Sequence, residues 1–120
     1  MPRYVDGFVI PIPKKNLKAY GRMAQKAGKV WKDHGALEYR ECIGDDLDVK
    51  FGMPFPRAIR TKRGETVVFS WIEYRSKKHR DDVNKKVMKD PRIQNMMKSQ
   101  AMPFDDKRMI YGGFEVIVKF

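Results

Sequence analysis

Residues 66–74 have the sequence Thr-Val-Val-Phe-Ser-Trp-Ile-Glu-Tyr, which is the strongest strand signal in the chain. Its β-branched and aromatic side chains are the types enriched in β-strands. Alternation along a strand divides these side chains between two faces. One face holds Val68 and Ile72, and the other holds Val67, Phe69, Trp71 and Glu73. Because both faces carry large apolar groups, we expect this strand to lie in a sheet that is covered on both sides.

The segment before this strand predicts another strand and a long amphipathic helix. Residues 4–10 are predicted as a first strand, which should stop at Pro11 and Pro13 because proline cannot donate to a strand ladder. Residues 17–34 repeat apolar side chains at the period of a helix with one buried face. The members of that face are Leu17, Tyr20, Met23, Ala24, Ala27, Val30, Trp31 and His34. A second strand is expected over residues 36–43.

Residues 44–64 are predicted as a long loop between the second strand and the strand at 66–74. Loops longer than ~15 residues in a compact domain usually cover functional sites or are mobile. Part of this loop should pack against the body, because it contains the large apolar side chains Phe51, Met53, Phe55 and Ile59.

Two helices and a final strand are predicted after residue 74. Ser76 is the expected N-cap of the first of these helices. Asp90-Pro91 breaks it and begins a short further helix, with Asp90 as its cap. The side chains expected to face inward there are Ile93, Met96 and Met97. The last strand should run from residue 109 to about residue 119.

The predicted order is β-α-β-β-α-β with an extra short helix, an α+β fold of the ferredoxin-like type. Strands joined through a helix are parallel with a right-handed connection, which favours a four-stranded antiparallel sheet with its helices on one face. The other face would expose large apolar groups from the third and fourth strands. Since such patches usually mark an interface and two-fold homodimers are the commonest oligomers, we expect two copies to pair.

Length and composition indicate one domain over residues 1–120 in the cytoplasm. No apolar run approaches the ~20 residues that span a bilayer, so no membrane association is expected. The start of the chain lacks the apolar core of a signal peptide. One cysteine and two histidines offer no metal-ligand spacing, and neither a metal nor a cofactor is predicted.

The chain is strongly basic, with a formal net charge of +11. Residues 14–32 contain seven basic side chains and no acid. Helical spacing aligns five of them opposite the apolar face: Lys15, Lys18, Arg22, Lys26 and Lys29. Two interpretations stay open for this stripe, a solvated surface and a site for a polyanion such as RNA.

Several blocks of the sequence resemble the YbaA-like family of bacterial proteins. They are Tyr4–Phe8, Gly35–Cys42, Val67–Tyr74, Met88–Arg92, Met102–Asp105 and Lys107–Glu115. The resemblance runs nearly end to end and implies the dimeric α/β-barrel fold, in which two ferredoxin-like sheets close around a central hollow. It implies no activity, because the family is one of unknown function.

The hollow of such a barrel is the candidate site for a small organic molecule. Polar and aromatic strand residues supply its candidate lining: Asp6, Glu38, Arg40, Trp71, Glu73, Tyr111 and Glu115. Carboxylates beside an arginine and a tyrosine can bind a small polar ligand, or transfer protons if burial shifts their pKa values. The alternative interpretation is a set of ordinary paired interface charges.

Two further hypotheses about function remain. The sequence leaves open whether the protein is an enzyme. One is non-specific polyanion binding through the basic helix. The other is a cofactor-free or haem monooxygenase-like enzyme, since Trp71 and His79 resemble the strand tryptophan and helix histidine of haem-degrading members of this superfamily. Asp6 stands where that branch has an asparagine, so the resemblance is incomplete. No catalytic residue is identified.

Overall fold

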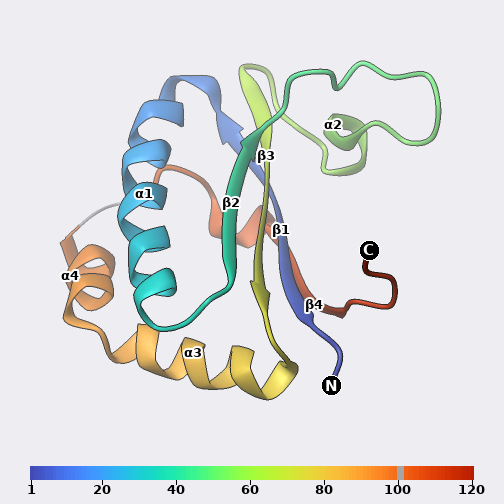
Figure 1. Ribbon diagram of the computed structural model, residues 1–120. Helices are drawn as coiled ribbons and strands as arrows, with labels where there is room; N and C mark the ends of the chain where they lie inside the picture. The colour runs from blue at the N-terminus through green and yellow to red at the C-terminus, as the bar shows by residue number, and fades with distance from the viewer. Residues whose placement is uncertain (100–101) are drawn as a thin grey trace.

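The computed structural model describes residues 1–99 and 102–120, and its centre is a four-stranded antiparallel sheet in the order β2-β3-β1-β4 (Figure 1). The strands are β1 (Tyr4–Pro13), β2 (Glu38–Ile43), β3 (Glu65–Tyr74) and β4 (Ile110–Glu115). The helices are α1 (Leu17–Asp33), α2 (Phe55–Ala58), α3 (Lys77–Lys89) and α4 (Pro91–Ser99). Short 3-10 turns occupy Lys14–Asn16 and Asp106–Arg108. The predicted α+β arrangement is confirmed.

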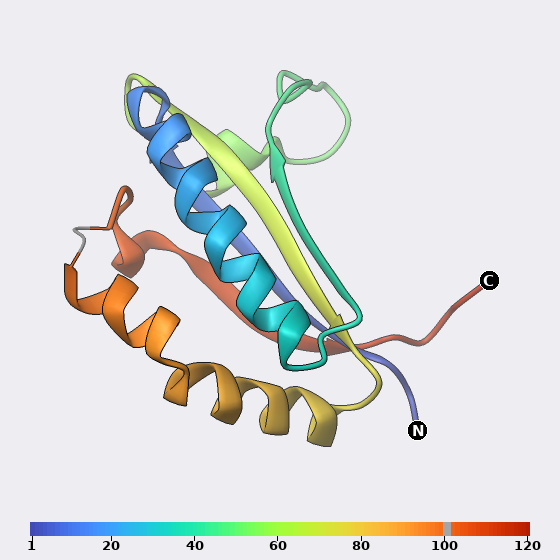
Figure 2. The same ribbon diagram turned by 60° about the vertical axis from the view of Figure 1, so that its left-hand side comes forward.

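Three helices, α1, α3 and α4, cover one face of the sheet, as both views show (Figures 1 and 2). One core cluster lies where these helices meet β3, and its buried members are Val30, Ala36, Ile72, Tyr74, Val83, Val87 and Ile93. A second cluster joins α1 to β1 and β3 through Ile10, Ile12, Tyr20, Ala24 and Val68. The buried face predicted for residues 17–34 is therefore the face that α1 packs on the sheet.

The first strand is longer than predicted, because it continues through both prolines to Pro13. β4 pairs with β1 only as far as Val9 opposite Ile110, whereas β3 accompanies β1 to its end. Residues 10–13 therefore have one neighbouring strand, as at a sheet edge, where proline is tolerated.

The last strand is shorter than predicted. It ends at Glu115, and one more backbone hydrogen bond follows, from Val116 N to Arg3 O at 2.9 Å. Continuing the same register would bring Ile117 opposite Pro2, which has no N–H to donate. The chain beyond this point leaves the sheet on the side away from the helices (Figure 1).

The helix boundaries after β3 agree with the prediction. Ser76 Oγ accepts from the backbone N–H of His79 at 3.1 Å, and Asp90 Oδ1 accepts from the N–H of Arg92 at 2.9 Å. Ile93 is buried as expected, but Met97 is 67% exposed and does not face inward. No helix in the described ranges is both long and apolar enough to cross a membrane.

Candidate functional site

The sheet face opposite the helices, called here the open face, is apolar along β1, β3 and β4, and it is uncovered except at the Val67 end of β3. Phe69, Ile110 and Phe114 are 42%, 53% and 61% exposed. The register places Gly7 between Trp71 and Gly112 in the middle of this face. A Cβ at Gly7 would lie 3.5 Å from the Phe114 ring, so the two glycines let that ring lie close to the backbone.

The long loop lies on the same side of the sheet as the open face (Figure 1). Its short helix α2 places the Phe55 ring edge-on to Phe69, with ring centres 6.0 Å apart, and Ile59 is buried. Part of the loop therefore packs down, as predicted. Phe51 and Met53 do not, because they are 96% and 61% exposed.

Four of the seven predicted lining residues lie on the open face, along β2 and β3. Glu38 is opposite Glu73 and Arg40 is opposite Trp71 in the register. Glu73 Oε2 accepts from Arg3 Nη1 at 2.8 Å, and Arg40 Nη2 lies 3.7 Å from Glu38 Oε2. The charges at this side of the face are thus arranged in pairs around an aromatic ring.

Asp6 and Tyr111 lie on the helical side of the sheet instead. Asp6 is 2% exposed, and its Oδ1 accepts from Arg80 Nη1 at 2.6 Å and from the Tyr111 hydroxyl at 3.3 Å. Burial raises the pKa of Asp6, while the Arg80 charge opposes that rise. The sheet therefore separates these two residues from Glu38, Arg40, Trp71 and Glu73. Glu115 is exposed at the end of β4, opposite Tyr4.

Trp71 and His79 lie on opposite sides of the sheet. His79 packs against Tyr74, with ring centres 6.0 Å apart, and its Nδ1 accepts from the Arg75 N–H at 3.0 Å. Burial lowers the pKa of His79. The pair that resembled a haem site is therefore not brought together within one chain. The described residues also contain no cluster of three or more metal-ligating side chains.

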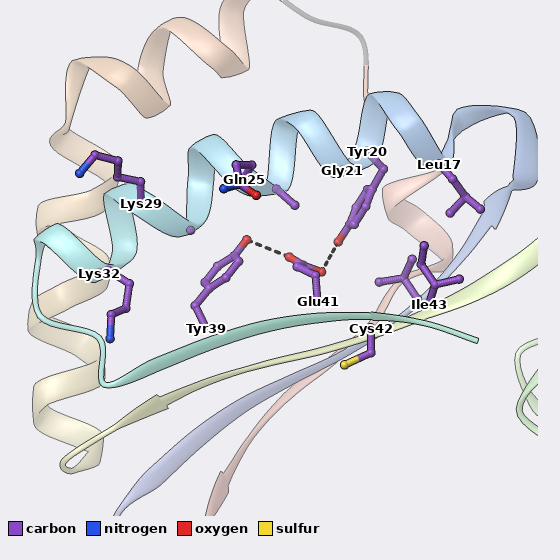
Figure 3. A pocket seen from close by; sticks show the side chains of 13 residues that line it. Leu17, Tyr20, Gly21, Gln25, Lys29, Lys32, Tyr39, Glu41, Cys42 and Ile43 are labelled. Atoms are coloured by element: carbon purple, nitrogen blue, oxygen red, sulfur yellow. Dashed lines mark hydrogen bonds between the residues drawn. The ribbon is translucent and has the colours of Figure 1, made fainter. Parts of the chain in front are cut away.

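A groove of about 500 Å³ runs between α1 and the edge strand β2, and sequence reasoning did not find it (Figure 3). At its floor, Glu41 accepts from the hydroxyl of Tyr20 at 2.7 Å and from that of Tyr39 at 2.8 Å. Burial raises the pKa of both tyrosines, so both phenols remain donors at neutral pH. Tyr39 and Glu41 share a strand face by their two-residue spacing, which was the available sequence signal.

The Tyr39 ring occupies its position because α1 has a glycine opposite it. A Cβ at Gly28 would lie 2.8 Å from two Tyr39 ring atoms. Gly21 lies two helical turns earlier and also lines the groove. A Cβ at Gly21 would meet no atom within 4 Å. Small residues on this side of α1 thus open the groove.

A cavity of about 340 Å³, open to solvent like the groove, lies between α1 and the helical side of the sheet. It shares Tyr20, Ala24, Tyr39 and Glu41 with the groove. Its other walls are mostly apolar, and the Tyr20 ring meets Phe104 edge-on, with centres 5.7 Å apart. The Glu41 carboxylate and the phenols of Tyr20 and Tyr39 are therefore shared by the groove and the cavity.

The sequence model described as "Protein of unknown function (DUF1428)" matches residues 3–106. The chain belongs to the DUF1428 family. It is 47% identical over 116 residues to the uncharacterized protein YbaA of Escherichia coli (strain K12), and to that of Shigella flexneri. Each alignment covers 97% of both proteins. The predicted resemblance to the YbaA-like family is confirmed.

The fold of this DUF1428 protein is similar to that of a solved dimeric ferredoxin-like protein from an uncultured marine organism. The TM-score is 0.60 at 10% sequence identity, and the match covers 100% of both chains. The ferredoxin-like fold is therefore confirmed, and at this identity the likeness concerns the fold alone.

Proposed function

We propose that this DUF1428 protein is a homodimer whose two open faces pack together around a hollow that binds a small organic molecule. One observation carries the proposal: Phe69, Ile110 and Phe114 are each more than two-fifths exposed on one continuous face. Exposed apolar patches of this kind mark interaction sites, because leaving them in water forfeits about 25 cal/mol per Å² of buried area.

The features around the open face support a second copy of this chain as the molecule that covers it. The loop end with Phe51 and the C-terminal segment with Ile117 and Phe120 extend on the same side, with their apolar side chains exposed (Figure 1). The structural neighbour of the same fold is described as dimeric. A two-fold pairing would cover the open face and these extensions together.

The residues beside the aromatic centre of the open face support the binding of a polar organic molecule. Arg40 is 54% exposed and Glu38 is 47% exposed, next to Trp71. A mostly apolar lining with a few convergent polar groups is typical of ligand sites. Asp6 and Tyr111 take no part, since they lie on the helical side of the sheet.

The experiment begins with the mass in solution. Light scattering should give about twice the chain mass of 14.1 kDa. Phe114→Glu should yield a monomer, because a charge would be buried at the centre of the interface. Met97→Glu is the matched control, since Met97 is exposed on α4, away from the open face. A wild-type protein that stays monomeric at every concentration would contradict the proposal.

The ligand is tested by thermal shift with quinones, flavins, haem, amino acids and small organic acids. A ligand of the hollow should raise the melting temperature of the wild type and leave Phe114→Glu unchanged, because binding to the folded state alone stabilises it. If no class stabilises the wild type, the binding part of the proposal is wrong.

A second function, polyanion binding, has one specific observation in its favour. Lys18, Arg22 and Lys26 are exposed on α1, and Lys15 is exposed in the 3-10 turn just before it. These four cations form no ion pair in the described part of the chain, whereas Lys29 lies 3.4 Å from Asp33. Charge reversal at Lys18, Arg22 and Lys26 should weaken retention on RNA at low salt. Reversal of Lys78, Lys85 and Lys89 on α3 is the control of equal net charge. Equal retention of the two variants on RNA would show that the basic stripe of α1 is not the binding surface.

A further inference from the structure

The cavity between α1 and the sheet has the size and the lining of a ligand site. Its volume of about 340 Å³ falls at the lower end of the range for such sites. Six of its apolar wall residues are Phe8, Met23, Trp31, Ile72, Phe104 and Met109.

The polar wall of the cavity offers hydrogen-bond acceptors. Each oxygen of Glu41 already accepts one phenol, from Tyr20 and from Tyr39. A carboxylate has about four acceptor positions, so about two remain for a ligand. An O–H or N–H donor bound there would make a charge-assisted hydrogen bond, which is roughly twice as strong as a neutral one.

The surrounding charges select against ionised ligands. The cavity wall itself carries both signs of charge, Glu41 and Asp106 against Arg40, so an ion of either sign meets a like charge there. The groove at the other side of Glu41 is lined by Lys29 and Lys32, and the chain carries a net charge of +11, so a cation is also disfavoured on approach (Figure 3). An uncharged donor fits the site best.

We propose that the cavity between α1 and the sheet is a second binding site, which takes a small uncharged apolar molecule bearing one hydrogen-bond donor directed at Glu41. Its body would lie among the aromatic and methionine side chains of the cavity. The site lies within one chain, on the opposite side of the sheet from the open face. It therefore stands independently of the proposed homodimer.

Indole and 1-methylindole are matched probes for this site, because they differ by the N–H donor. Calorimetric titration of the wild type should show indole binding more tightly, by roughly two- to ten-fold, since Glu41 is an exposed residue and a solvent-screened hydrogen bond contributes about 0.5–1.5 kcal/mol. Glu41→Leu should bind the two probes equally. No binding of indole at millimolar concentration, or equal binding of both probes to the wild type, would overturn the proposal.

Filling the cavity tests its location. Ala24→Leu and Ala27→Leu both add a side chain to the cavity wall. Each should abolish indole binding. Ala19→Leu, on the exposed side of α1, should leave the affinity for indole unchanged. Indole binding that survives both cavity-filling substitutions would contradict the assignment.

The open-face variant separates this site from the proposed inter-sheet hollow. Phe114→Glu should retain the full indole affinity and the preference over 1-methylindole, because Phe114 lies on the other side of the sheet. If Phe114→Glu loses indole binding, the indole belongs to the open face and the second site is wrong. Failure of dimerisation alone would leave the expected results for indole unchanged.

Discussion

Arg80 of α3 and Asp6 of β1 form a buried ion pair across the boundary between helix and sheet. Arg80 Nη1 lies 2.6 Å from Asp6 Oδ1, and the two side chains are 14% and 2% exposed. The guanidinium carbon is 4.8 Å from the centre of the Tyr4 ring, and Nη1 also donates to the Tyr111 hydroxyl at 3.1 Å. This pair therefore joins α3 to both β1 and β4.

Removing Arg80 should destabilise the protein strongly. Arg80→Met leaves the Asp6 carboxylate buried without its counter-charge, which typically costs roughly 3 kcal/mol or more. Urea denaturation measures this loss. Arg22→Met, at an exposed position on α1, is the control and should change the free energy of unfolding by no more than about 0.5 kcal/mol. Equal losses in the two variants would show that the ion pair has no special role.

The cost of Arg80→Met should also depend on pH. Burial raises the pKa of Asp6, and loss of the opposing Arg80 charge would raise it further. A carboxyl whose pKa is higher in the folded state favours folding below its unfolded pKa of about 3.9, and this contribution is lost as the pH rises through the folded value. The destabilisation should therefore be smaller at about pH 4 than at about pH 7.

Glu65 should show the opposite pH dependence. Arg108 Nη1 and Nη2 donate to its two oxygens at 2.7 and 2.9 Å, and these bonds lower the pKa of Glu65 to about 2. Its stabilisation is present above the unfolded pKa of about 4.3 and is lost as the pH falls towards about 2. Glu65→Gln should lower the melting temperature at about pH 7 and converge with the wild type near pH 2.

Asp46→Asn provides the control for Glu65→Gln, because Asp46 is exposed in the long loop. Its melting temperature should follow the wild type across the whole pH range. A Glu65→Gln curve that stays parallel to the wild type down to about pH 2 would mean that Glu65 titrates normally.

Two glycines of α1 should respond oppositely to alanine. Gly21→Ala should stabilise the protein by about 1 kcal/mol, because a methyl group there meets no atom within 4 Å and alanine favours helix. Gly28→Ala should destabilise it by roughly 1–3 kcal/mol, because the methyl group would overlap the Tyr39 ring. Chemical denaturation of both variants decides the matter. A gain in stability for Gly28→Ala would show that Tyr39 can move freely.

The N-cap of α3 should stabilise the protein through a single side-chain hydrogen bond. Ser76→Ala removes the acceptor for the His79 N–H and should cost about 1 kcal/mol. Ser76→Asp keeps an acceptor and should stay within a few tenths of the wild-type free energy of unfolding. Thermal denaturation that ranks Ser76→Asp below Ser76→Ala would rule out capping as the cause.

The candidate site was only partly predictable, and Asp6 illustrates why. Alternation in β1 puts Asp6 on the face of Phe8 and Ile10, with Val5 and Val9 on the other face. Both sets are apolar, so the pattern does not show which of them meets the helices. The burial of Asp6 against Arg80 depends on α3, whose contact with β1 spans 74 positions of sequence.

Sequence by itself determined the order of strands and helices, the buried side of α1, and the excess of apolar groups on β3 and β4. These features follow from local periodicity and from side-chain type, which every segment carries alone. Tertiary structure alone decided that Tyr20 contacts Glu41 and that the groove and the cavity share these two residues. The physical reason is distance: residues from separate elements come within hydrogen-bonding range only after the layers pack, and packing is a property of the whole chain.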